Sequence, residues 1–122
     1  MTAPGMQFHI RAGDESPALM IGPGKIALLE AIAQTGSISA AAKLLRMSYR
    51  RAWLLVDETN RCLTAPAVYA VAGGTSGGGT ALTVAGIELV QRYRDVERVT
   101  AAAVHDKLQP LLRAVGVRTR GR

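Results

Sequence analysis

Residues 25–61 contain three short segments with helical apolar spacing, separated by only two brief interruptions. The first helix is predicted over residues 25–34, where apolar side chains recur every three or four positions before a glycine. Ser37 or Ser39 can cap a second helix that runs to Leu45, because a serine oxygen accepts N–H groups left free in a first helical turn. Connections this short confine the chain to folds built from packed neighbouring helices.

A third helix is predicted to follow Arg46-Met47 directly, with Ser48 as its cap and residues 49–61 as its body. A tight joint between a second and a third helix is typical of the helix-turn-helix motif. In that motif the third helix, here about residues 48–61, enters the major groove of DNA.

The two faces of this third helix differ in chemistry. Arg50 and Arg51 are predicted to point outward near its N-terminal end, where a guanidinium can contact guanine or clamp a phosphate. The opposite face, led by Trp53, is predicted to dock on the first helix. Charged residues on an amphipathic helix also commonly form no more than a solvated surface. The apolar Leu54 among them keeps a protein-interaction surface open as an alternative.

A wing is predicted after the third helix. Residues 67–72 favour a strand, the glycine-rich residues 73–80 favour a hairpin tip, and residues 81–82 begin a returning strand. Thr83 can cap the helix that follows. Residues 62–91 contain no Lys or Arg, so we expect the wing to offer only hydroxyl and backbone N–H groups to phosphates.

The remaining segments complete a mainly α fold with a small β wing. A winged helix-turn-helix domain is predicted over residues 1–83, with an N-terminal strand at about residues 6–12. Residues 84–112 are predicted to form one long helix for dimerisation, which Pro110 interrupts or ends. The basic tail, residues 113–122, is expected to be disordered.

Charge and cysteine content narrow the functional classes. Lys and Arg number 15 against 9 Asp and Glu, a net charge of +6 that favours a polyanionic partner such as double-stranded DNA. The single cysteine, Cys62, excludes an intrachain disulfide. The sequence shows neither a signal peptide nor a long apolar span, so a cytoplasmic location without membrane association is expected.

Catalytic and cofactor sites are not expected. His9, His105 and Cys62 are too far apart in sequence to suggest a metal site or a nucleophile with its base. The glycine-rich stretch mimics a phosphate-binding loop, but Gly79 stands where that loop requires lysine. We therefore predict no enzymatic activity and no cofactor.

The chain resembles the DNA-binding domain of the ModE family of molybdenum-responsive transcriptional regulators and, more distantly, the LysR-type amino-terminal domain. The resemblance covers about residues 6–100. It is carried by Gly36-Ser-Ile-Ser-Ala-Ala-Ala42, Met47-Ser-Tyr-Arg-Arg-Ala-Trp53, Val56-Asp57 with Asn60, and Gly73-Gly-Thr-Ser-Gly-Gly-Gly-Thr80 followed by Leu82-Thr83.

The resemblance implies a sequence-specific regulator, linked to molybdenum metabolism, that binds a palindromic operator as a homodimer. The expected DNA-contacting residues are Ser37, Ser39, Ser48, Tyr49, Arg50, Arg51 and, in the wing, Thr75 and Ser76. The apolar side of the long helix is expected to form the dimer seam through Ile87, Val90, Tyr93, Val96 and Val99. Two such domains would place their recognition helices about one duplex turn apart.

Two further expectations qualify this function. The chain ends before a carboxy-terminal molybdate-binding region could fit, so we expect a stand-alone DNA-binding domain without a molybdate effector site. The alternative is a winged-helix protein-interaction module without specific DNA binding, because a fold does not dictate a function.

Overall fold

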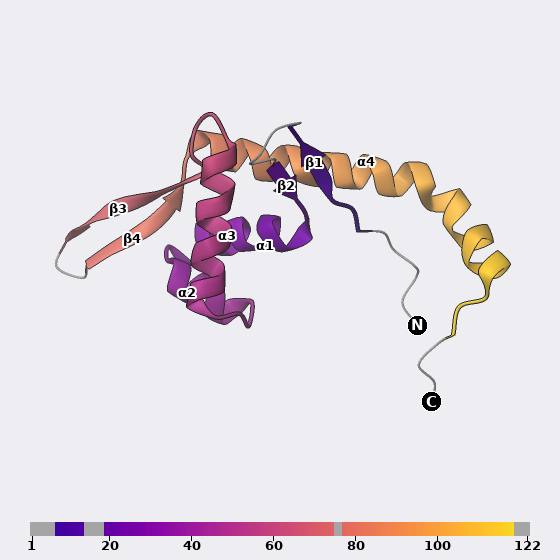
Figure 1. Cartoon of the computed structure of the whole chain (residues 1–122), viewed down its shortest axis with the longest axis horizontal. Helices are drawn as coiled ribbons and strands as arrows, with labels where there is room; N and C mark the ends of the chain where they lie inside the picture. Colours follow the sequence, from indigo (N-terminus) through magenta and orange to yellow (C-terminus); the bar gives the residue numbers. More distant parts are fainter. Residues whose placement is uncertain (1–6, 14–18, 75–76, 119–122) are drawn as a thin grey trace.

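The computed structural model describes residues 7–13, 19–74 and 77–118, and it is mainly helical with a small two-stranded wing, as predicted (Figure 1). The elements in chain order are β1 (Ile10–Ala12), β2 (Leu19–Ile21), α1 (Pro23–Thr35), α2 (Ile38–Leu44), α3 (Tyr49–Cys62), β3 (Val68–Gly74), β4 (Gly77–Leu82) and α4 (Val84–Val115). In Figure 1, α4 extends away from the other helices, and the β3–β4 wing projects in the opposite direction.

Hydroxyl side chains cap the N-termini of three of the four described helices. The hydroxyl oxygens of Ser37, Ser48 and Thr83 each accept a hydrogen bond from the backbone N–H three residues later, at 2.9, 3.1 and 3.0 Å. These bonds satisfy N–H groups that have no partner within the first helical turn. The predicted caps of α3 and α4 are confirmed, and the structure selects Ser37 rather than Ser39 as the cap of α2.

The main core lies where α1, α2 and α3 meet. α1 supplies its largest fully buried side chains, Leu28, Leu29 and Ile32. The other two helices contribute mostly small side chains: Ala41, Ala42, Ala52 and Val56. Small residues at a contact let helix axes approach closely, so α3 is held tightly against α1 and α2.

The wing is an antiparallel pair of strands anchored at the C-terminal end of α1. Val68 of β3 pairs with Leu82 of β4 at its base. The Thr80 N–H donates a 2.8 Å hydrogen bond to the carbonyl oxygen of Gly36, and a Cβ atom on Gly79 would lie 2.8 Å from that same oxygen. Glycine at position 79 therefore permits the close approach that places the wing beside α1.

The N-terminal strand is one half of a hairpin, in which β1 pairs antiparallel with β2. The sequence prediction placed one strand at about residues 6–12 and missed β2. The hairpin region packs on α4 through Tyr93, which is only 2% exposed. The Tyr93 ring stacks on Phe8 with centroids 5.1 Å apart, and its hydroxyl donates to the Phe8 carbonyl oxygen at 2.9 Å.

α4 is longer than predicted and continues through Pro110 to Val115. A proline removes one helical hydrogen bond and crowds the preceding turn, which bends a helix without necessarily ending it. The neighbouring Leu, Gln and Arg residues favour helix strongly enough to continue it. Residues 113–115 are thus helical rather than part of a disordered tail, and residues 119–122 lie outside the described residues. No described helix, α4 included, is long and apolar enough to cross a membrane.

Candidate nucleic-acid interface

The exposed face of α3 carries the two predicted arginines. Ala52, Val56 and Thr59 are buried and define its inner side. Arg50 and Arg51 are both exposed, as predicted, in the first turn of the helix. The chain therefore presents two exposed guanidinium groups in the first turn of the third helix. Arg50 lies on the side away from Ala52, and Arg51 lies at the edge of the helix.

Trp53 does not belong to the core, and the prediction that it docks on α1 is wrong. Its side chain is 45% exposed, and Tyr49 one turn earlier is exposed as well. Each helical residue turns about 100° around the axis, so Trp53 lies well to one side of Ala52. The side of α3 that faces the core is lined by small and β-branched side chains, and the indole lies outside it.

The charges on α3 divide into paired and unpaired groups. Asp57 forms an ion pair with Arg61 at 3.0 Å, and Glu58 forms one with Lys25 of α1 at 2.8 Å. No carboxylate among the described residues lies within ion-pair distance of Arg50 or Arg51. The acidic groups of α3 are thus neutralised locally, whereas the positive charges of its first turn face solvent.

The other predicted DNA contacts differ in position. Ser37 and Ser48 lie at the starts of α2 and α3, where their oxygens accept cap hydrogen bonds. A serine hydroxyl that accepts a hydrogen bond can still donate its own proton, so both can contact an acceptor. Ser39 is exposed on the first turn of α2. Thr75 and Ser76 at the tip of the wing lie outside the described residues.

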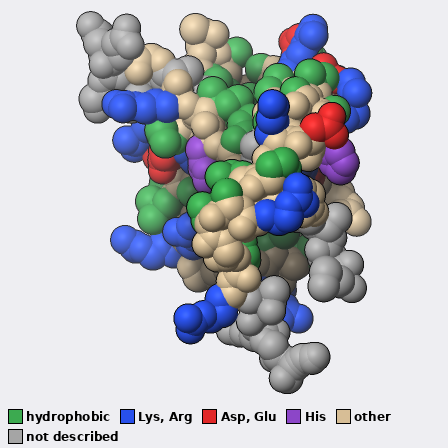
Figure 2. All heavy atoms as spheres, turned by 90° about the vertical axis from the view of Figure 1, so that its right-hand side faces the viewer, with side chains coloured by type: hydrophobic (Ala, Val, Ile, Leu, Met, Phe, Trp, Pro, Cys, Tyr) green, Lys and Arg blue, Asp and Glu red, His purple; other side chains and the backbone are tan. Residues whose placement is uncertain are grey.

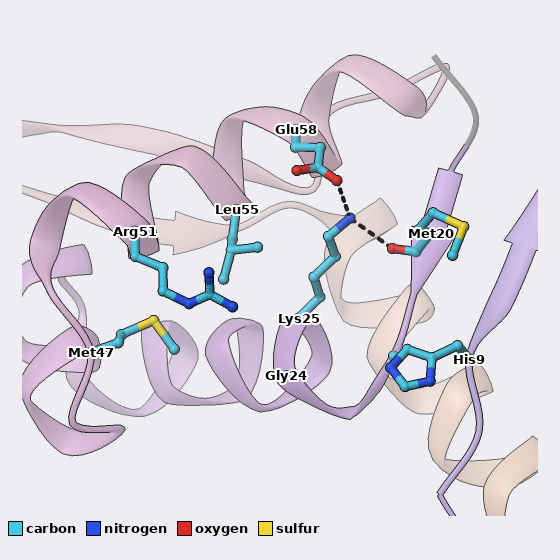
Figure 3. A pocket seen from close by; sticks show the side chains of 9 residues that line it. His9, Met20, Gly24, Lys25, Met47, Arg51, Leu55 and Glu58 are labelled. Atoms are coloured by element: carbon cyan, nitrogen blue, oxygen red, sulfur yellow. Dashed lines mark hydrogen bonds and ion pairs between the residues drawn. The ribbon is translucent and has the colours of Figure 1, made fainter. Parts of the chain in front are cut away.

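Lys25 links the recognition helix to the N-terminal hairpin, a role that the sequence analysis missed. Its ammonium group donates to Glu58 Oε1 of α3 at 2.8 Å and to the Met20 carbonyl oxygen of β2 at 2.7 Å (Figure 3). It lies at the edge of a cavity of about 280 Å³ that Arg51 and His9 also line. A lysine in the first turn of α1, ahead of an apolar stretch, was the available signal.

The predicted seam residues of α4 do not share one face. Tyr93 is a core residue of its own chain rather than a seam residue, and Val90 packs against the same core. Ile87, Val96 and Val99 are exposed. Since nine residues turn a helix by about two and a half turns, Ile87 and Val96 point in opposite directions.

Figure 2 views the molecule from the side toward which α4 extends. Hydrophobic side chains are exposed on this face, with Lys and Arg side chains around and between them. In the described part of the chain, no three His, Cys, Asp or Glu side chains are grouped so that they could hold a metal ion.

The chain is similar in sequence to two curated proteins. It is 40% identical over 115 residues to the molybdenum-pterin-binding protein MopB of Rhodobacter capsulatus, covering 88% of this chain and 43% of MopB. It is 41% identical over 75 residues to the DNA-binding transcriptional dual regulator ModE of Escherichia coli K12, covering 62% of this chain and 29% of ModE. The chain thus spans less than half the length of these relatives. No protein-family model matches it.

A solved structure supports the fold. A point mutant of MepR from a multidrug-resistant S. aureus clinical isolate superimposes with a TM-score of 0.50 and 18% sequence identity, covering 78% of this chain and 79% of that one. At this identity the likeness concerns the fold alone.

Proposed function

The chain is a ModE-type winged-helix domain, and we propose that it acts as a DNA-binding transcriptional regulator that reads a palindromic operator as a homodimer. The observation that carries this proposal is the pair of exposed arginines, Arg50 and Arg51, that have no ion-pair partner among the described residues. They lie at the end of α3 that approaches base edges in helix-turn-helix complexes. The name of the Escherichia coli relative, a DNA-binding regulator, supports the same reading.

The recognition helix has a rigid frame. Its inner side shares one core with the large side chains of α1 and the alanines of α2. Lys25 of α1 donates hydrogen bonds both to Glu58 of α3 and to the Met20 carbonyl oxygen of β2. A rigid helix keeps its side chains in fixed register with the base pairs, which is what sequence reading requires.

Homodimerisation is proposed through α4. Its face toward the core carries Gly86, Val90 and Tyr93, and residues at the same three- and four-residue spacing continue that face beyond the core. The continuation contains four apolar side chains, all at least partly exposed: Val104, Leu108, Leu111 and Val115. An apolar stripe along a protruding helix suits pairing with a second copy, which brings two recognition helices onto one operator.

A link to molybdenum metabolism is proposed from the names of the relatives, which include a molybdenum-pterin-binding protein. We place the protein in the cytoplasm, where an operator is accessible. The described residues give no argument for a molybdate site, and we propose none on them.

The proposal is tested by selecting binding sites from a pool of random DNA duplexes at two salt concentrations. The wild type and an Arg50→Ala, Arg51→Ala double variant are compared. Wild-type enrichment of a palindrome, lost in the variant, is the expected result. Weak binding without sequence preference that modest salt abolishes would show that only net charge acts, and would favour a protein-interaction module instead.

A further inference from the structure

We propose that Leu54 reads thymine, through apolar contact between its side chain and the thymine C5-methyl group in the major groove. The proposal rests on the DNA binding proposed above and assigns a base to one position of the recognition helix. It starts from the finding that the exposed surface of α3 carries large apolar side chains beside its arginines: Leu54, as predicted, and Trp53, against the prediction.

Leu54 lies near the middle of the outward face of α3. It is 46% exposed and follows Arg50 by one helical turn. Tyr49, Arg50, Trp53 and Leu54 together line a hollow of about 410 Å³ on this surface. Trp53 therefore forms an apolar wall beside Leu54, while Arg50 supplies a charge at its N-terminal side.

The chemistry of the groove selects the base. In the major groove, thymine presents a methyl group beside its O4 acceptor, whereas the other bases present donors and acceptors but no methyl group. A leucine side chain cannot donate or accept a hydrogen bond. Facing guanine, cytosine or adenine, Leu54 would desolvate polar atoms without pairing them, which is unfavourable.

Charge favours DNA over a protein as the occupant of this face. Arg50 and Arg51 flank the patch without ion pairs among the described residues. The acidic side chains further along α3, Asp57 and Glu58, are each paired with a cation and so repel phosphates less. A partner protein with an apolar groove would need to tolerate two unpaired arginines at its edge.

The helix geometry also predicts where the thymine lies. Four residues rise about 6 Å along a helix, and base pairs are spaced by about 3.4 Å. If Arg50 contacts a guanine, the thymine read by Leu54 should lie within about two base pairs of it.

The test replaces each thymine of the selected operator by deoxyuridine, which removes only the methyl group. Affinities of the wild type and Leu54→Ala are measured for every substituted duplex. At one thymine per half-site, the wild type should lose about fourfold in affinity, as expected for one buried methyl group, and Leu54→Ala should lose nothing further there. Leu44→Ala, which removes an exposed leucine from α2, serves as the matched control and should keep the methyl sensitivity.

Circular dichroism and urea unfolding establish that Leu54→Ala is folded. The proposal is overturned if no thymine shows a methyl effect in the wild type, or if that effect persists in Leu54→Ala. In either case the proposed specific binding of DNA would not be contradicted. The exposed apolar face of α3 would then be assigned to a protein partner instead. A wild type that selects no sequence at all would overturn both the proposed function and this inference.

Discussion

Asn60, near the end of α3, holds Val68, the first residue of the wing strand β3, by a pair of side-chain hydrogen bonds. The Asn60 amide oxygen accepts the Val68 N–H at 3.2 Å, and its amide nitrogen donates to the Val68 carbonyl oxygen at 3.2 Å. The same oxygen accepts the Ala67 N–H at 2.8 Å. One side chain thus joins the recognition helix to the wing and satisfies backbone groups of two buried residues.

Replacing Asn60 by alanine should lower the free energy of unfolding by roughly 2 kcal/mol, because buried N–H groups lose their acceptor. Urea unfolding followed by circular dichroism measures the change. Asn60→Asp keeps the acceptor but replaces the donor by a second oxygen that faces the Val68 carbonyl oxygen, so it should also be less stable than the wild type. An Asn60→Ala variant as stable as the wild type would show that water replaces these bonds at no cost.

Local signals predicted the helices well. The caps Ser48 and Thr83 and the stop at Gly36 depend on hydrogen bonds and backbone angles within a few residues, which residue type alone encodes. Positions set by tertiary packing were not predictable in this way. Trp53 faces solvent and Tyr93 faces the core because neighbouring helices determine which part of an apolar surface is covered.

The exposure of Trp53 changes the expected effect of its removal. Trp53→Ala should cost less than about 1 kcal/mol of unfolding free energy, because the indole is not enclosed by the core. Ile32→Ala, by contrast, should cost about 2–5 kcal/mol, since Ile32 is completely buried. Urea unfolding of the two variants tests the difference. A loss of several kcal/mol for Trp53→Ala would show instead that the indole packs in the core.

Gly86 should not tolerate a side chain even though it lies within a helix. A Cβ atom there would overlap the carbonyl oxygen of Ala67. Gly86→Ala is therefore expected to destabilise the protein by about 1–3 kcal/mol, as overpacking does. Gly24→Ala in α1 is the matched control, because nothing lies within 4 Å of its added Cβ. It should be neutral or slightly stabilising, since alanine favours helix over glycine, and thermal unfolding would rank the two variants.

An ion pair between α1 and α4 should make stability depend on pH. Arg94 donates to both carboxylate oxygens of Glu30, at 3.0 and 2.6 Å. These hydrogen bonds lower the pKa of Glu30 from its ordinary value of 4.5, against a smaller opposing effect of burial. A carboxylate whose pKa is lowered by folding adds stability above its ordinary pKa and loses it as the pH falls through the lowered value.

Glu30→Gln should therefore lower stability at neutral pH by up to about 1 kcal/mol, because the pair is partly exposed and screened by solvent. The difference from the wild type should vanish in acid. Glu88→Gln removes a more exposed pair within α4 and should change little at any pH. Urea unfolding at a series of pH values measures all three proteins. A difference between Glu30→Gln and the wild type that is independent of pH would contradict the assignment to this ion pair.

Introducing a carboxylate into each of the two candidate seams on α4 shows which of them forms the dimer. Leu111 and Val115 are 55% and 68% exposed and continue the face that packs on the core, whereas Ile87 is exposed on another side of the helix. A buried, unpaired carboxylate in an interface is strongly unfavourable. We therefore expect a Leu108→Glu, Leu111→Glu double variant to sediment as a monomer at micromolar concentration, while the wild type and Ile87→Glu sediment as dimers.

The same variants report on operator binding. A monomer keeps one recognition helix and its arginines, so it should retain salt-sensitive, nonspecific DNA binding but lose most of its affinity for a palindrome. Ile87→Glu should bind the palindrome like the wild type. If Ile87→Glu were the monomeric variant and Leu108→Glu, Leu111→Glu remained dimeric, pairing would use the N-terminal half of α4, as the sequence suggested. The stripe beyond the core would then have another partner. A wild-type protein that sediments as a monomer would exclude both seams.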